Sequence, residues 1–392
     1  MIKTKLRNLV TEYSLRNRNG SCTDVYSVTN SQGFIPSTDY FSKEVFSKDL
    51  TTYKIVKKGM IAYNPSRINV GSVAVQRVAE EVIVSPLYVV FSVNEDELIP
   101  EYLTYFLHSD KGLHQISSNT SGSVRDSLKF TALQNIEINT YSLEEQKEII
   151  VKFQKFERLI EKQKALLKKL DDLVKSQFIE MFGELGKDIK GWGLRPLGDC
   201  CELNPRKSDD SRLAAGLEVT FVPMPAVSEN GEMDSSCVKL YEQVQTGFTY
   251  FAENDVLFAK ITPCMENGKG AVARGLKNGV GFGSTEFHVL RPIAGVSNPV
   301  WLYVVTTFRK FRQDAAKKMT GSAGQRRVPS SLLASYTISL PPLELQNAFA
   351  RFVEQTDKSK VLNLIHFFSI NPYRRVVKSG KICYNKAHKE VV

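Results

Sequence analysis

The sequence predicts a mixed α+β protein with two similar modules, separated by one long helix of the coiled-coil type. Three observations support this fold class. Motifs recur in the same order about 200 residues apart, short strand and helix patterns alternate within each copy, and a heptad pattern separates the copies. The 392 residues, 42% of them hydrophobic, suffice for two or three packed domains.

The internal repeat is clearest at the end of each module. TSGSVRDSLKFTALQNIEINTYSLEEQ begins at residue 120, and TGSAGQRRVPSSLLASYTISLPPLELQ begins at residue 320. Both contain a Gly-Ser turn, basic residues, a short alternating strand and a final L-E-x-Q element. Gln146 and Gln346 are therefore 200 residues apart. A second matching pair lies upstream, at 57–75 and 253–273, so chance similarity is a poor explanation.

Local patterns within each copy favour a compact α+β module. Runs such as MIAYN and VIVSPLYVVF carry β-branched and aromatic residues between turn-forming residues, which is typical of strands. ELIPEYLTYFLHSDKG and NPVWLYVVTTFRKFRQDAAKKM carry a proline near the start and charges along one face, which is typical of short helices.

A heptad pattern follows the first module. Apolar or long side chains recur three and four residues apart from Phe153 to Met181, and charged residues fill most other positions. The pattern predicts one helix within residues 143–185, ended by Gly183 and Gly186. Such a long one-sided helix needs a partner helix to bury its apolar stripe. The residues expected to pack against that partner are Phe153, Phe156, Ile160, Leu167, Leu170 and Val174.

The formal net charge of +10 is concentrated at the two ends of the chain. Residues 1–20 carry a net +4 and residues 361–392 a net +5, so any nucleic-acid site in the body must come from local clusters. The six cysteines and five histidines are scattered, and we expect no metal site and reduced thiols. No signal-peptide pattern and no apolar run of about 20 residues occurs, so we expect a cytoplasmic protein without a membrane partner.

The sequence resembles the specificity subunit of type I restriction-modification enzymes. The resemblance is carried by the stretch Tyr63–Val75, the G-S-V-R loop at 122–125, the L-E-E-Q start of the long helix, and the second-half motifs at 320–327 and 340–346. It implies two target-recognition domains that each read one half of a split DNA target, and two paired helices that set the gap. We expect the two domains at 1–142 and 186–342, the central helix at 143–185 and the start of the second spacer helix at 343–360. Residues 361–392 form an atypical basic tail that the resemblance does not imply.

The same resemblance implies the partners of this chain. They are double-stranded DNA, type I methyltransferase subunits and a restriction subunit that translocates DNA. S-adenosylmethionine is expected on the methyltransferase partner, and no cofactor is expected on this chain.

The candidate DNA-binding residues lie in loops where basic and small polar residues are neighbours. Arginine can bridge two acceptors of guanine, and glutamine can pair with adenine. In the first module the candidates are Arg67, Ser123, Arg125 and Lys129. In the second they are Lys260, Lys269, Arg274, Ser322, Gln325, Arg326 and Arg327.

No catalytic site is expected. Asn64-Pro65-Ser66 and Asn204-Pro205-Arg206 partly resemble the N-P-P-aromatic motif of DNA amino-methyltransferases, but both lack the second proline and the aromatic residue. Two alternatives stay open. One is a stand-alone DNA-modification enzyme with an unrecognised catalytic domain, and the other is a coiled-coil adaptor that does not bind DNA.

The C-terminal region departs from the family pattern. A second heptad helix is expected after residue 343, but the apolar spacing does not continue past Phe367, and Asn371-Pro372 would interrupt a helix. We therefore expect the second helix to be replaced at the C-terminus. The central helix would then lack its partner within the chain, and the chain would either fold poorly alone or pair this helix with a second copy or a methyltransferase subunit.

Overall fold

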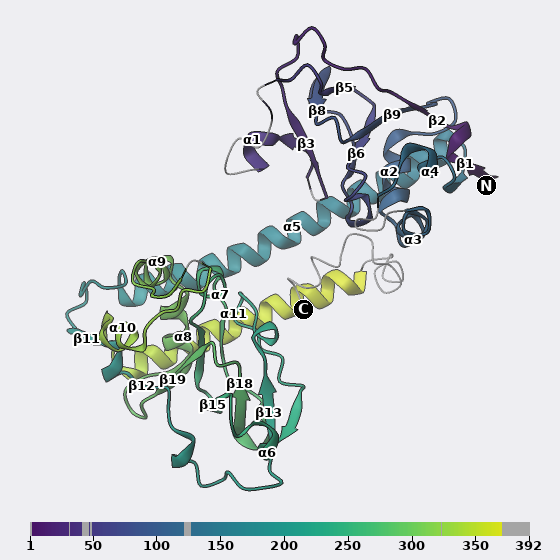
Figure 1. Cartoon of the computed structure of the whole chain (residues 1–392). Helices are drawn as coiled ribbons and strands as arrows, with labels where there is room; N and C mark the ends of the chain where they lie inside the picture. The colour runs from purple at the N-terminus through teal and green to yellow at the C-terminus, as the bar shows by residue number, and fades with distance from the viewer. Residues whose placement is uncertain are drawn as a thin grey trace. The chain divides into compact units, whose positions relative to one another are not determined.

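The computed structural model describes residues 2–30, 32–40, 47, 49–120, 127–322 and 324–370 (Figure 1). The chain divides into two compact units, whose main bodies are Met1–Lys162 and Gln163–Phe367. Their boundary falls inside the long helix α5 (Leu143–Phe182). We therefore describe each unit by itself.

The first unit is a mixed α+β module followed by the first half of α5. Its strands are β1 (Ile2–Lys5), β2 (Val10–Glu12), β3 (Tyr26–Thr29), β4 (Gly33–Pro36), β5 (Lys54–Lys57), β6 (Ile61–Tyr63), β7 (Val73–Val75), β8 (Glu81–Val84), β9 (Val89–Val93) and β10 (Glu137–Thr140). Its helices before α5 are η1 (Leu6–Asn8), α1 (Ser37–Tyr40), η2 (Ile68–Val70), α2 (Pro100–His108), α3 (Asp110–Asn119) and α4 (Phe130–Leu133).

The second unit contains the rest of α5, a second α+β module and the last described helix. Its strands are β11 (Leu194–Pro196), β12 (Cys201–Leu203), β13 (Glu218–Val222), β14 (Val238–Leu240), β15 (Thr249–Ala252), β16 (Val256–Ala259), β17 (Gly270–Val272), β18 (Val280–Gly283), β19 (Phe287–Pro292) and β20 (Thr337–Ser339). Its helices are η3 (Leu197–Asp199), η4 (Lys207–Asp209), η5 (Met224–Ala226), α6 (Tyr241–Val244), α7 (Cys264–Asn267), η6 (Lys277–Gly279), α8 (Pro299–Thr307), α9 (Arg309–Lys317), α10 (Ser330–Ser335) and α11 (Leu343–Ile370).

The two modules share one strand order, which confirms the duplication predicted from the sequence. A four-stranded antiparallel sheet has the order β2-β9-β6-β7 in the first unit and β12-β19-β16-β17 in the second. The first and last strands of each module also pair antiparallel, as β1 with β10 and as β11 with β20. Because register fixes which side chains face the core, the two copies bury corresponding positions.

The modules differ outside this shared sheet. The first adds two separate strand pairs, β3-β4 and β5-β8. The second instead has a four-stranded sheet of order β14-β13-β18-β15, in which β13 and β18 are parallel. The copies therefore keep one scaffold and vary the structure attached to it.

Two buried glutamines fix the start of the long helix that follows each module. Gln146 Oε1 accepts from Ile99 N–H at 2.8 Å, and Gln146 Nε2 donates to the carbonyls of Glu97 and Tyr141. Gln346 repeats this arrangement. Its Oε1 accepts from Asn298 N–H at 2.9 Å, and its Nε2 donates to the carbonyls of Val296 and Pro341. The L-E-x-Q element thus ties each helix to the loop before α2 or α8.

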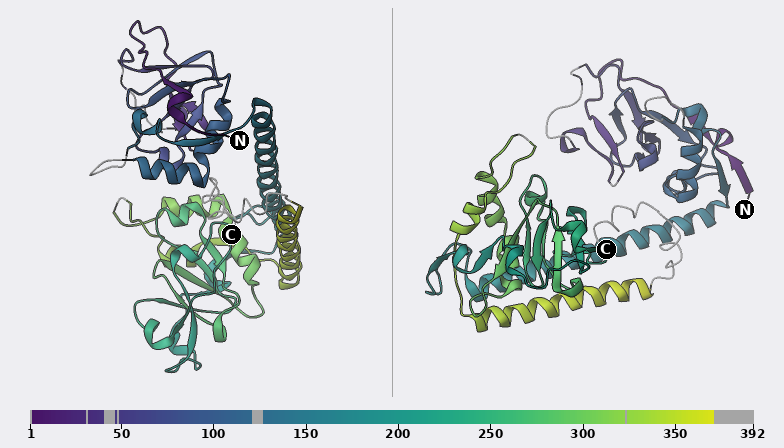
Figure 2. Two further views of the ribbon diagram at one scale, coloured as in Figure 1. Left: turned by 90° about the vertical axis from the view of Figure 1, so that its right-hand side faces the viewer. Right: turned by 60° about the horizontal axis from the view of Figure 1, so that its bottom comes forward.

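The second half of α5 packs antiparallel to α11 (Figures 1 and 2). Near the end of α5, Phe178 and Phe182 contact Phe349 at ring-centroid distances of 5.5 and 5.4 Å. Earlier on α5, Asp171 pairs with Lys360 of α11 at 2.7 Å. As the residue number falls on α5 it rises on α11, which defines the antiparallel direction.

This pairing corrects one expectation from the sequence. The second spacer helix continues to Ile370, beyond residue 360, and the second half of α5 does not lack its partner. Phe349, which precedes residue 360, packs against Phe178 and Phe182 of α5, so this part of the pairing does not need apolar spacing past residue 360. Residues 371–392 of the predicted tail lie outside the described residues.

The predicted helix-packing residues differ in their burial. Val174 is buried in the core of the second unit, beside Phe178 and Phe182. In the first unit, the Phe153 ring stacks on Tyr105 of α2 at 4.9 Å. The other four, Phe156, Ile160, Leu167 and Leu170, are half-buried.

Candidate nucleic-acid interface

The candidate loop of the first module ends against the strand β6. The Leu128 N–H donates to the Pro65 carbonyl at 3.1 Å, and the buried Tyr63 hydroxyl donates to the Leu128 carbonyl at 3.1 Å. Arg67 and Lys129, close to this contact in the chain, are exposed. Neither makes a side-chain hydrogen bond or ion pair with the described residues. Ser123 and Arg125 lie outside the described residues.

The second module builds the same contact with a different side chain. The Val328 N–H donates to the Lys260 carbonyl at 2.9 Å, just as Leu128 donates to Pro65. The Val328 carbonyl accepts from His288 Nε2 at 2.8 Å, where the first module uses the Tyr63 hydroxyl. We call this contact at Leu128 or Val328 the loop anchor.

The hydrogen bonds of His288 show which ring nitrogen carries a proton. A carbonyl can only accept, so Nε2 carries the proton, and Nδ1 accepts from the Asn204 amide at 3.2 Å. Burial lowers the pKa of His288, the dominant effect over the opposing hydrogen bond to Val328. The imidazole is therefore neutral at pH 7, with its proton on Nε2 directed at the Val328 carbonyl.

The loop before the anchor in the second module is a closed hairpin. Thr320 and Arg327 exchange two backbone hydrogen bonds, of 3.0 and 2.8 Å, and Thr262 N–H donates to the Arg326 carbonyl at 3.0 Å. Ser322 and Gln325 are exposed on this hairpin. Gly321 has a φ of +120°, and a Cβ there would lie 2.8 Å from the Gln325 carbonyl oxygen, so the turn requires glycine. The fold thus brings together five candidates, namely Lys260, Ser322, Gln325, Arg326 and Arg327.

Two carboxylates accompany the arginines of this hairpin. Arg327 Nε and Nη2 donate to Glu286 at 2.9 and 2.8 Å, and Arg326 Nη2 lies 3.9 Å from Glu266. The hydrogen bonds from Arg327 lower the pKa of Glu286, so its carboxylate is ionised at neutral pH. Sequence reasoning missed Glu286, Glu266 and His288, because partners 40 to 60 positions apart in the chain carry no spacing signal for contact.

The side chains of the other two candidates of the second module have their partners outside the hairpin. Lys269 Nζ is 3.4 Å from the Met224 carbonyl. Arg274 follows the opposite end of the β16-β17 ladder and pairs with Glu354 of α11 at 3.2 Å. Arg274 therefore contacts the helix pair rather than the hairpin.

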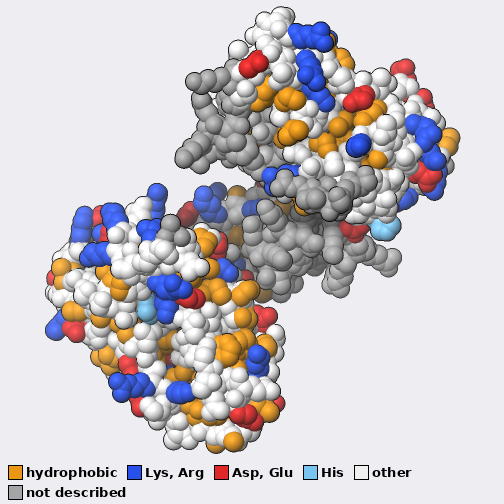
Figure 3. All heavy atoms as spheres, in the orientation of Figure 1, with side chains coloured by type: hydrophobic (Ala, Val, Ile, Leu, Met, Phe, Trp, Pro, Cys, Tyr) orange, Lys and Arg blue, Asp and Glu red, His pale blue; other side chains and the backbone are white. Residues whose placement is uncertain are grey.

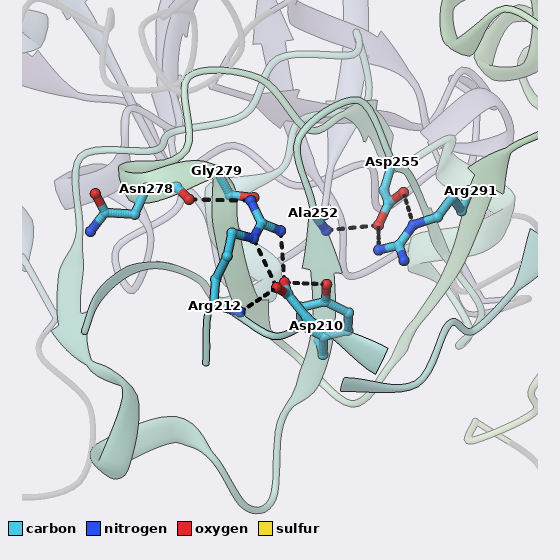
Figure 4. Close-up of polar contacts among 8 residues, drawn as sticks. Asp210, Arg212, Ala252, Asp255, Asn278, Gly279 and Arg291 are labelled. Atoms are coloured by element: carbon cyan, nitrogen blue, oxygen red, sulfur yellow. Dashed lines mark hydrogen bonds and ion pairs between the residues drawn. The ribbon is translucent and has the colours of Figure 1, made fainter. Parts of the chain in front are cut away.

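A second polar network holds the long loop between β12 and β13 (Figure 4). Asp210 accepts from Arg212 Nε and Nη2 at 2.8 and 2.6 Å and from the Tyr250 hydroxyl at 2.7 Å. The Arg291 guanidinium lies 5.5 Å from the Tyr250 ring centroid and pairs with the buried Asp255 at 2.7 Å. The network joins the two sheets of the second module, so we assign it a structural role.

The surface of the second unit carries separate groups of basic side chains. In the space-filling view, Lys and Arg side chains gather over the region of α9, and others lie apart, between acidic and apolar side chains (Figure 3).

Among the described residues, no three His, Cys, Asp or Glu side chains are grouped as a metal site would need. No described helix has the length and apolar content to cross a membrane.

These features define a two-module α+β protein, in which one scaffold is used twice and carries different polar loops. A family profile described as type I restriction modification DNA specificity domain matches residues 14–171 and 189–364. The chain belongs to this family, which confirms the resemblance found in the sequence.

Known relatives agree with this assignment. The chain is 35% identical over 193 residues to the type I restriction enzyme EcoAI specificity subunit of Escherichia coli, covering 48% of this chain and 32% of that protein. It is 37% identical over 187 residues to the EcoEI specificity subunit of the same organism, covering 47% and 29%. Each match thus spans about a third of the relative's length.

One solved structure supports the fold over the whole chain. It belongs to a study of complex assembly and conformational transition of the type I restriction-modification system. The TM-score is 0.52 with 17% identity, over 99% of this chain and 95% of that one. At this identity the match concerns the fold alone.

Proposed function

We propose that this chain is the DNA sequence-recognition subunit of a type I restriction-modification complex. Each module reads one half of a split target, and the helices α5 and α11 set the gap between the halves. The observation that carries this proposal is the repeated loop anchor, at Leu128 and at Val328, beside exposed basic residues in both modules. Two copies of one scaffold with different loops suit the reading of two different half-sites.

The chemistry of methylation and cleavage then belongs to partner subunits. We assign S-adenosylmethionine to the methyltransferase subunits and no catalytic step to this chain. Leu159, Leu166 and Leu173 support a docking role for α5, because they recur every seven residues and stay 44%, 37% and 46% exposed. A helix of a methyltransferase subunit could cover this stripe.

Methylome mapping tests the proposal. The chain is co-expressed with its methyltransferase subunits in a host that lacks other DNA methylation, and modified bases are located by sequencing. We expect one split motif with a fixed gap, and no modification when either component is omitted. A continuous motif would contradict the two-module mechanism. Methylation by this chain alone would support a stand-alone enzyme, and an absence of any motif would favour a protein-binding adaptor.

A further inference from the structure

Arg327 and Glu286 form a side-on ion pair next to the loop anchor of the second module. Arg327 Nε donates to Glu286 Oε2 at 2.9 Å, Nη2 donates to Oε1 at 2.8 Å, and Nη1 donates to the Gln325 carbonyl at 3.1 Å. A guanidinium has five N–H groups, so one on Nη1 and one on Nη2 are left over. The Arg327 side chain is 43% exposed, and these groups can therefore meet a ligand.

The pair is present in only one of the two modules. Val90 and Val289 occupy matching positions, since their carbonyls accept from Tyr13 N–H and Asn204 N–H respectively. The residue three positions earlier is Leu87 in the first module and Glu286 in the second. Likewise, the residue before the loop anchor is Ser127 in the first and Arg327 in the second.

The scaffold does not depend on this pair. The first module forms the same loop anchor with Leu87 and Ser127 in place of the two charges. In the second module, Glu286 supports the loop through its backbone carbonyl, which accepts from Lys260 N–H at 2.9 Å. The two side chains are therefore an addition specific to the second module, placed on an exposed loop.

We propose that Glu286 is a positioning residue that orients Arg327 to read a guanine in the half-site of the second module. This inference rests on the proposed function. The carboxylate fixes the plane of the guanidinium before DNA binds, and the remaining N–H groups on Nη1 and Nη2 are available to O6 and N7 of guanine. Preorganisation of this kind favours a bidentate contact.

A contact to a phosphate fits the pair less well. Phosphate binding depends on net positive charge and releases counterions, whereas Glu286 neutralises the charge of Arg327. A neutralised but oriented guanidinium loses long-range attraction and keeps the directional hydrogen bonds that distinguish bases. The geometry thus favours base reading over backbone attachment.

Single-position specificity of the methyltransferase complex tests this inference. The complex containing the full chain is assayed on a DNA library in which every position of the mapped motif is varied, and methylation of each sequence is quantified. The variants are Glu286→Gln, which removes the charge at constant size, and Arg327→Lys, which retains the charge but cannot bridge two acceptors. Glu218→Gln is the matched control, since it removes the same charge from an exposed ion pair with Lys277 in the same unit.

We expect both variants to lower the preference for guanine at one shared position by roughly tenfold. Other positions and the Glu218→Gln variant should keep the wild-type preference. An unchanged preference for guanine in the Glu286→Gln variant would overturn the inference. So would an equal loss of methylation on every DNA sequence, together with a salt dependence reduced by about one phosphate contact. Should Glu286→Gln fail to fold, Arg327→Lys decides by the same criteria. A wild-type complex without a split motif would instead refute the proposed function, and this inference with it.

Discussion

Replacing Gln346 with alanine is the most direct test of how the helix pair is attached to the second module. The side chain is fully buried and joins three backbone groups from two segments of the chain, the loop before α8 and the residues before α11. Gln346→Ala removes one acceptor and two donated hydrogen bonds. It leaves the Asn298 N–H and the carbonyls of Val296 and Pro341 without these partners.

The cost can be worked from the environment of each group. The contacts to Asn298 and Val296 are partly buried, so each unsatisfied group should cost about 1 kcal/mol. The contact to Pro341 is buried, and its carbonyl should cost about 1–3 kcal/mol. We therefore expect the free energy of unfolding of the second unit to fall by about 3–5 kcal/mol.

Tryptophan fluorescence in urea can follow this unit selectively, because both tryptophans, Trp192 and Trp301, belong to it. At a slope of about 2.5 kcal/mol/M, the urea midpoint should fall by about 1–2 M. Gln355→Ala on the same helix is the control, since Gln355 is exposed and should leave the midpoint unchanged. A shift below about 0.3 M for Gln346→Ala, or an equal shift in the control, would refute the reasoning.

The remaining predictions use the same fluorescence measurement. Because burial lowers the pKa of His288, the unfolded chain binds a proton near pH 6.5 while the native imidazole stays neutral. The urea midpoint should therefore decrease as the pH is lowered from 7.5 to 5.5. His288→Gln should reduce this pH dependence, and an unchanged slope would contradict the assignment. Arg291→Met leaves Asp255, which is 1% exposed, without its ion-pair partner and should cost about 3 kcal/mol; a loss below about 1 kcal/mol would show that the buried carboxylate needs no cation. Phe349→Ala should lower the free energy of unfolding by about 3–5 kcal/mol through loss of aromatic packing. Lys360→Met should change it by less than about 1 kcal/mol. A larger loss for Lys360→Met than for Phe349→Ala would be inconsistent with an apolar helix interface.

The sequence was informative wherever a physical constraint acts on neighbouring positions. Heptad spacing predicted α5, because one face of a helix repeats every three or four residues. The repeated glutamine of L-E-x-Q predicted the duplication, because each copy must satisfy the same backbone groups at the start of a long helix. Gly183, with a φ of +82°, follows the last residue of α5, as the predicted helix end requires.

Contacts between distant segments were not predictable in this way. Glu286 lies 41 residues before Arg327, and only the register of β16 with β19 brings its strand to the hairpin. Arg274 was predicted as a DNA-binding candidate of the second module, but its position beyond β17 directs it to Glu354. The sequence could therefore indicate which loops are polar, but not which polar side chains contact each other.

The comparison of the two modules shows how one scaffold can serve two different recognition sites. The loop anchor keeps the same backbone acceptors, yet it is closed by a tyrosine hydroxyl in one copy and by a neutral histidine in the other. Since both side chains donate one hydrogen bond to the same carbonyl, the exchange preserves the loop base while its surroundings change from Leu87 and Ser127 to Glu286 and Arg327. Stability is thus supplied by the anchor, and the charged side chains outside it are free to differ. A surface that can change without loss of the fold is what a protein needs if its two copies are to read different DNA half-sites.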